Sequence, residues 1–88
     1  MTFEFAGFII GNDKAEFAAQ YESKLCTCEW VPTPEFASTF TTARQANNAI
    51  KKLGNPFRLW VLKLLDCGDR FIVTTDEKDQ PPWFEKLR

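Results

Sequence analysis

The sequence contains no histidine, the side chain that most often acts as a general base in enzymes. Nucleophile pairs that need an imidazole, such as Ser with His or Cys with His, are therefore excluded. Carboxylates and lysines remain, but acid pairs such as Asp66 with Asp69 fall in predicted turns, where acids are common. We expect a protein that is not an enzyme.

Cysteines are few and odd in number, at positions 26, 28 and 67, and the first two are too close to bridge comfortably. This pattern favours reduced thiols over a secreted disulfide framework. A closed zinc site would need a carboxylate or a second subunit as further ligands, because histidine is missing. We predict no metal and no other cofactor.

Long hydrophobic runs are also lacking. The longest uncharged apolar stretch covers residues 5–11, far too short to span a bilayer, and the first four residues lack the basic start of a signal peptide. We expect a cytoplasmic protein that does not bind a membrane.

The chain has 88 residues, enough for one domain, and it is rich in aromatic residues, with nine Phe and three Trp. The clearest element is a helix over residues 43–53. Thr42 and Gln45 form a capping box before it, small apolar residues recur at helical spacing, and Gly54 ends it.

Strands are predicted on both sides of this helix. One runs from Phe3 to Gly11, a short one covers residues 37–41, and two antiparallel strands flank the turn "DCGD", with Gly68 in the left-handed conformation. Residues 13–25 fit either a hairpin with a turn at "GNDK" or a helix, and we favour the hairpin. The predicted class is α+β: an antiparallel sheet of four or five strands in a single domain over residues 1–75, followed by an aromatic tail at 76–88.

The strand after the helix is apolar on both faces. Trp60, Leu62 and Leu64 share one face, and Leu59 and Val61 share the other. One helix covers only one face of a sheet. The other face must meet the proline-rich loop around Trp30 and Phe36, the tail, a second copy of the chain in a homodimer, or a target.

The segments "NDKAEFAAQ", Trp30 and "EFASTFTTARQANNAIKKLG" resemble a pattern seen in small phage and prophage proteins. In that pattern a hairpin and a lone Trp lead to an Ala-x-x-Phe-x-Thr signature that opens an alanine-rich helix, here at Ala37, Phe40 and Thr42. Some anti-CRISPR proteins are similar in size and acidity. The resemblance implies an accessory protein that binds a bacterial defence component inside the host cell, and it transfers no site residue.

The leading hypothesis is accordingly a non-enzymatic protein-binding module that inhibits a host protein or a protein–nucleic acid complex by occlusion or charge mimicry. Trp83 and Phe84, in the tail "PPWFEKLR", either pack on the protein's own sheet or anchor the partner. The predicted partner-binding residues combine aromatic anchors with acids of the acidic N-terminal half: Trp83, Phe84, Trp30, Glu16, Glu22 and Glu29.

The alternative hypothesis is a single-stranded nucleic-acid-binding protein. Residues 44–70 hold six basic residues against two acids, and aromatic residues lie among them. The predicted face consists of Arg58, Trp60, Lys63, Arg70 and Phe71.

Overall fold

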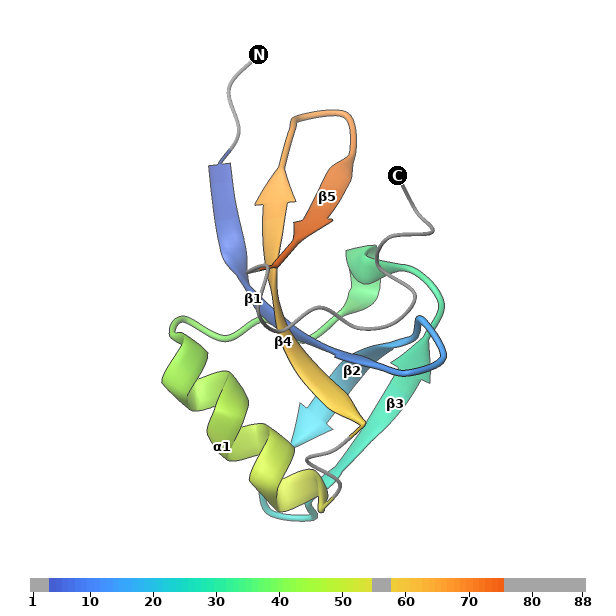
Figure 1. Cartoon of the computed structure of the whole chain (residues 1–88), viewed down its shortest axis with the longest axis vertical. Coiled ribbons are helices and arrows are strands. Elements are labelled where there is room, and N and C mark those ends of the chain that lie inside the picture. Colours follow the sequence, from blue (N-terminus) through green and yellow to red (C-terminus); the bar gives the residue numbers. More distant parts are fainter. Residues whose placement is uncertain (1–3, 55–57, 76–88) are drawn as a thin grey trace.

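The computed structural model describes residues 4–54 and 58–75, which form one five-stranded antiparallel sheet and one α-helix (Figure 1). The elements follow in the order β1 (Glu4–Asn12), β2 (Phe17–Glu22), β3 (Thr27–Val31), the 3₁₀ turn η1 (Pro34–Phe36), α1 (Ala43–Leu53), β4 (Leu59–Asp66) and β5 (Phe71–Thr74). The strand order is β3-β2-β1-β4-β5. The predicted α+β class is confirmed.

The two long strands, β1 and β4, form the centre of the sheet and pair along almost their whole length, from Glu4 opposite Asp66 to Asn12 opposite Leu59. A bulge between Phe5 and Gly7 interrupts this register. Gly7 has a φ of 140°, and a Cβ there would lie 3.0 Å from the Cβ of Thr39. Glycine is needed at this point because the neighbouring backbone approaches closely.

β1 and β2 separate after the single ladder pair of Gly11 with Phe17. Residues 38–40 hydrogen-bond to both strands beyond this point. Ser38 N donates to Ala18 O at 2.8 Å, and Phe40 and Phe8 exchange two backbone hydrogen bonds of 2.8 Å each. The short strand predicted at 37–41 is therefore reduced to one bridge, because the segment is held at isolated points by two diverging strands.

Helix α1 has the predicted bounds and caps. Thr42 Oγ1 accepts a hydrogen bond from Gln45 N at 3.2 Å, and the Gln45 side chain accepts one from Thr41 N at 3.1 Å, one residue before the position that a capping box normally satisfies. Gly54, with a φ of 80°, donates its N–H to the carbonyls of Ile50 and Lys51. Local sequence signals thus fix both helix ends.

The core is divided by the sheet. The helix-side cluster packs under α1 and consists of Ile10, Ala18, Ala46, Ala49, Ile50 and Leu59. The opposite-side cluster consists of Ile9, Phe17, Leu62 and Leu64, with Val31, Ala37 and Trp60 packed against it. The predicted alternation of β4 is confirmed, and η1 lies next to β5.

Residues 13–25 form the favoured hairpin, and the helix considered for them is wrong: β1 ends at Asn12 and β2 begins at Phe17. The turn between β4 and β5 also follows the prediction, since Gly68 has a φ of 91° and its N–H donates to Asp66 Oδ1 at 2.8 Å. The predicted tail at 76–88, with Trp83 and Phe84, lies outside the described residues. Within the described residues, no helix is long and apolar enough to cross a membrane.

Candidate functional site

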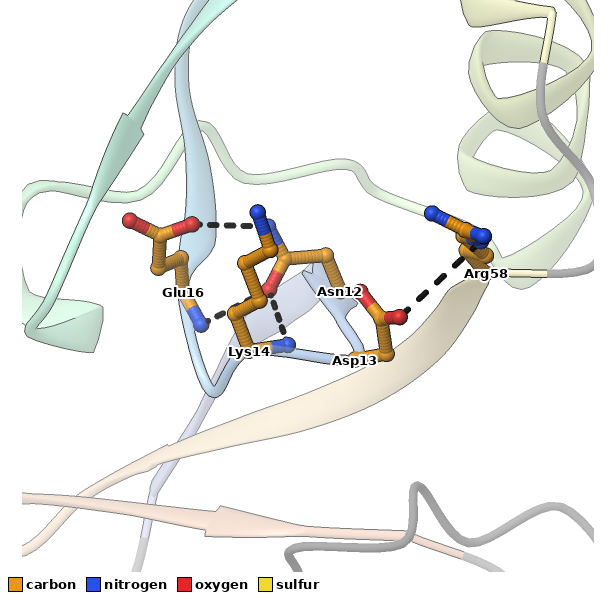
Figure 2. Close-up of polar contacts among 5 residues, drawn as sticks. All are labelled: Asn12, Asp13, Lys14, Glu16 and Arg58. Atoms are coloured by element: carbon orange, nitrogen blue, oxygen red, sulfur yellow. Dashed lines mark hydrogen bonds and ion pairs between the residues drawn. The ribbon is translucent and has the colours of Figure 1, made fainter.

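The turn between β1 and β2 is organised by one buried amide. Asn12 is 8% exposed, and its Oδ1 accepts hydrogen bonds from Lys14 N at 2.9 Å and Glu16 N at 3.0 Å. Its Nδ2 donates to Glu16 Oε1 at 3.1 Å. Figure 2 shows the Asn12 side chain between the Glu16 carboxylate and the pair of Asp13 with Arg58. Asn12 therefore fixes both the backbone of the turn and the Glu16 side chain.

This turn forms one wall of a cleft of about 450 Å³, which we call the turn cleft. Strand β3 contributes Thr27, Cys28 and Trp30, and the apolar part comes from Leu53 at the end of α1 and Leu59 at the start of β4. The volume lies in the range of small-ligand pockets, so the cleft is large enough for one bulky side chain of a partner.

Trp30 reaches the cleft because of the β2–β3 register. It lies directly opposite Ala18, a member of the helix-side cluster, and therefore shares the sheet face that carries α1. Its side chain is not covered completely, since Trp30 is 37% exposed. A half-exposed indole beside a cleft is the arrangement typical of an interface anchor.

The turn cleft is lined by two acidic and two basic side chains that differ in exposure. Arg58 Nε lies 4.0 Å from Asp13 Oδ2, and their side chains are 67% and 37% exposed, respectively. Glu16 is half-buried, whereas Lys14 is exposed. Glu16 is thus the most buried of these four charged groups, and Arg58 is the more exposed partner of the ion pair with Asp13. At 4.0 Å and with this exposure, the ion pair contributes little to stability.

A second cavity of about 490 Å³, the helix–strand groove, lies between α1 and β4. Lys51 of the helix and Lys63 of β4 both line it, together with the aromatic residues Phe8 and Trp60, of which Phe8 packs on the helix side. Among the described residues that line it, none is acidic. The groove therefore combines aromatic surface with positive charge.

The predicted acidic residues are not brought together. Glu16 immediately precedes β2 and Glu22 ends it, roughly 20 Å away at the usual rise per strand residue. Glu22 accepts a hydrogen bond from Lys24 N at 3.2 Å within the next turn. Glu29 lies opposite Ala19 and thus on the sheet face away from Trp30 and α1. Only Glu16 and Trp30, of the predicted partner-binding residues that the structure describes, share a site.

The predicted nucleic-acid face is also divided. Trp60 and Phe71 belong to the sheet face away from α1, because Trp60 packs against the opposite-side cluster and Phe71 lies opposite Asp66, on the same face of β4. Arg58 and Arg70 stand beyond opposite ends of β4. Lys63 lies opposite Phe8, on the helix side, so its side chain and that of Trp60 lie on opposite faces of the sheet.

The thiols are free and differ in exposure: Cys26 is exposed, Cys28 is half-buried and Cys67 is buried. Burial raises the pKa of the Cys28 thiol. Burial also raises the pKa of the Tyr21 hydroxyl, and the negative charges of Cys26, Cys28 and Glu22 add to this effect. Among residues 4–54 and 58–75, no three Cys, Asp or Glu side chains gather where they could hold a metal ion.

The central role of Asn12 in organising the turn between β1 and β2 was not predicted from the sequence. The stretch "GNDK" predicts a turn, and an Asn that opens a turn often bonds to the backbone two residues on, so the local role was readable. The sequence could not predict that the same cleft also includes Leu53, Arg58 and Leu59, because these residues are distant from the turn in the chain.

Comparisons of the chain with protein-family models, with curated proteins and with solved structures each gave no match.

Proposed function

We propose that this chain is a non-enzymatic protein-binding module, an inhibitor encoded by a phage or another mobile element that acts on a bacterial defence protein of the CRISPR type. The observation that carries the protein-binding part is the turn cleft, which is lined by the half-exposed Trp30 and by Glu16. The phage origin and the class of target rest on the sequence resemblance alone. In this proposal the protein works in the cytoplasm of the bacterial host.

Further exposed apolar side chains support a binding surface. Phe36 and Leu25 are each 71% exposed, and Phe5 is 52% exposed. Single exposed apolar residues are ordinary on a protein surface, so they serve here as secondary contacts around a central anchor.

Of the two modes of inhibition, occlusion has more support than charge mimicry. Mimicry of a phosphate backbone needs a row of acids on one surface, whereas Glu16, Glu22 and Glu29 lie at different ends and faces of the β2–β3 hairpin. Occlusion needs only an anchor and a fitting partner. Weak dependence of partner binding on salt is the result expected for occlusion.

The proposal is tested in bacteria that carry defined CRISPR systems. Expression of the wild-type protein should restore plaque formation by a targeted phage in one of these strains, and Trp30→Ala should abolish the effect. Phe36→Ala is the matched control, because it removes an exposed aromatic side chain outside the turn cleft. Circular dichroism and thermal melting of each variant verify that folding is unchanged.

Failure in every strain, together with no specific protein retained by the wild-type chain from nuclease-treated lysate, would overturn the proposal. A double variant, Trp83→Ala with Phe84→Ala, measures in the same assay whether the predicted tail anchor contributes. Size-exclusion chromatography with light scattering determines whether the active form is a monomer or a homodimer.

One observation favours nucleic acid as a second candidate partner. Lys51 and Lys63 line the helix–strand groove together with Phe8, which packs on the helix side of the sheet, and an aromatic surface with cationic side chains suits a single strand. Lys51→Glu should weaken binding of a fluorescent oligo(dT) at low salt. Lys52→Glu, the same charge change on a helix residue outside the groove, should weaken it less. No anisotropy change with wild-type protein would eliminate this candidate.

A further inference from the structure

The charged side chains that line the turn cleft differ in exposure. Glu16 is half-buried, whereas Asp13, Lys14 and Arg58 are exposed, and the Arg58 side chain is more exposed than that of Asp13. The Asn12 amide holds the Glu16 carboxylate in place through a 3.1 Å hydrogen bond. A guest that reaches the more buried part of the cleft therefore meets the fixed carboxylate of Glu16.

The aromatic side chain of Trp30 also favours a cationic guest. The face of an indole carries partial negative charge and attracts a cation placed within about 6 Å of the ring centre. Trp30 lines the cleft and keeps 37% of its surface exposed, so part of its side chain is accessible to a guest. The apolar contribution of Leu53 and Leu59 suits a guest that also has a hydrocarbon stem.

From these features we propose that the turn cleft binds the guanidinium group of an arginine side chain presented by the partner protein. A guanidinium stacks on an aromatic face and offers several N–H donors in one plane, so it can bond to carboxylates while it lies against Trp30. A lysine ammonium is a point charge that is more strongly hydrated and fits this combination less well. That the arginine belongs to a partner protein rests on the proposed function, whereas the preference of the cleft for a guanidinium does not.

Arg58 competes with such a guest for the Asp13 carboxylate. Its Nε lies 4.0 Å from Asp13 Oδ2, and the side chain is 67% exposed, so the pair is weak and open to exchange. Removal of the Arg58 charge should strengthen binding of a cationic guest, because Asp13 is released and repulsion falls. The same change would weaken binding of an anionic guest. The sign of this effect distinguishes the two classes of ligand.

The experiment is an NMR titration of the full chain with N-acetyl-arginine amide. N-acetyl-citrulline amide, which has nearly the same shape without the charge, is the control ligand. The Trp30 indole signal is assigned with Trp30→Phe. We expect saturable shifts of the Trp30 indole N–H and the Asn12 side-chain amide with the arginine probe only, with a dissociation constant in the millimolar range and weaker binding of lysine amide.

Variants that remove single charges test the role of each group in arginine binding. Arg58→Ala should lower the dissociation constant at least about twofold, a change that corresponds to roughly 0.4 kcal/mol. Glu16→Gln should raise the dissociation constant, whereas Glu29→Gln, on the other face of the sheet, should leave it unchanged. The amide spectrum of each variant reports whether the fold is retained.

Three results would overturn the assignment: no saturable shift with the arginine probe, equal shifts with citrulline amide or lysine amide, or weaker binding by Arg58→Ala. These results leave the proposed function standing if Trp30→Ala still loses the inhibitory effect in bacteria. Conversely, arginine binding without any inhibition or partner would confirm the cleft chemistry and count against the proposed inhibitor.

Discussion

Phe8 and Phe40 exchange two backbone hydrogen bonds of 2.8 Å, although 31 residues separate them in the chain. This bridge attaches the segment before α1 to the central strand β1. The Phe40 ring also meets Tyr21 edge-on at 5.7 Å between centroids. Phe40 therefore joins β1, β2 and the start of the helix.

Truncation of this ring should destabilise the fold. Phe40 packs against the helix-side cluster and is half-buried, so we expect Phe40→Ala to lower the free energy of unfolding by about 2–3 kcal/mol, somewhat less than for a fully buried Phe. Phe36→Ala, at a 71% exposed position, should change it by less than about 0.5 kcal/mol. Urea unfolding measures both, and equal effects would contradict the assigned role of Phe40.

Gly7 provides a test of close backbone approach. Gly7 and Gly68 both have a positive φ, but a Cβ at Gly7 would meet Thr39 and Phe40, whereas one at Gly68 has nothing within 4 Å. Gly68→Ala should cost about 1 kcal/mol for the conformation alone. Gly7→Ala should cost more, about 2–4 kcal/mol, because the strand and residues 39–40 must also move apart. Similar losses of stability in the two variants would show that the backbone at Gly7 does not closely approach residues 39–40.

The hydrogen bonds of Asn12 predict unequal effects for two substitutions. Asn12→Ala leaves the N–H groups of Lys14 and Glu16 without their acceptor and should destabilise the protein by about 2 kcal/mol. Asn12→Asp keeps an acceptor for both N–H groups but places a second carboxylate beside Glu16. Asn12→Asp should therefore be less stable than the wild type at pH 7, because the two carboxylates repel each other. Its stability should recover when the pH is lowered to about 4 and one carboxylate is protonated. Thermal melting at pH 7 and at low pH checks this difference.

The three thiols should react with iodoacetamide in the order Cys26, Cys28, Cys67. Cys26 is exposed, Cys28 is half-buried with a pKa raised by burial, and Cys67 is buried. Only the thiolate reacts, so both access and the raised pKa slow Cys28. Peptide mapping by mass spectrometry after timed quenching measures the order, and faster labelling of Cys28 than of Cys26 would refute it.

Stability should decrease in alkaline solution. The folded state raises the pKa of the Cys28 thiol and the Tyr21 hydroxyl, and both groups are neutral when protonated. Their contribution is fully present below the unfolded-state pKa values and is lost as the pH rises through the folded ones, from roughly pH 8.5 upward. The melting temperature should fall over this range, and a double variant, Tyr21→Phe with Cys28→Ala, should show a flatter profile. An identical profile in the double variant would assign the loss to other groups.

Several parts of this fold follow from short stretches of sequence. Thr42, Gln45 and Gly54 set the bounds of α1, and Gly68 with Asp66 sets the turn between β4 and β5, because caps and tight turns are made by neighbours in the chain. The alternation of apolar residues along β4 also predicts the two faces of the sheet, since successive side chains of a strand point to opposite sides.

The turn cleft was beyond such reasoning. Its walls come from the β1–β2 turn, β3, the end of α1 and the start of β4, and only the strand order and the crossing of the helix place them around one cavity. The same holds for the separation of Glu29 from Trp30, which depends on the β2–β3 register. Local chemistry thus determined the elements of this protein, whereas contacts between distant residues, which are formed only in the packed chain, decided which side chains share a site.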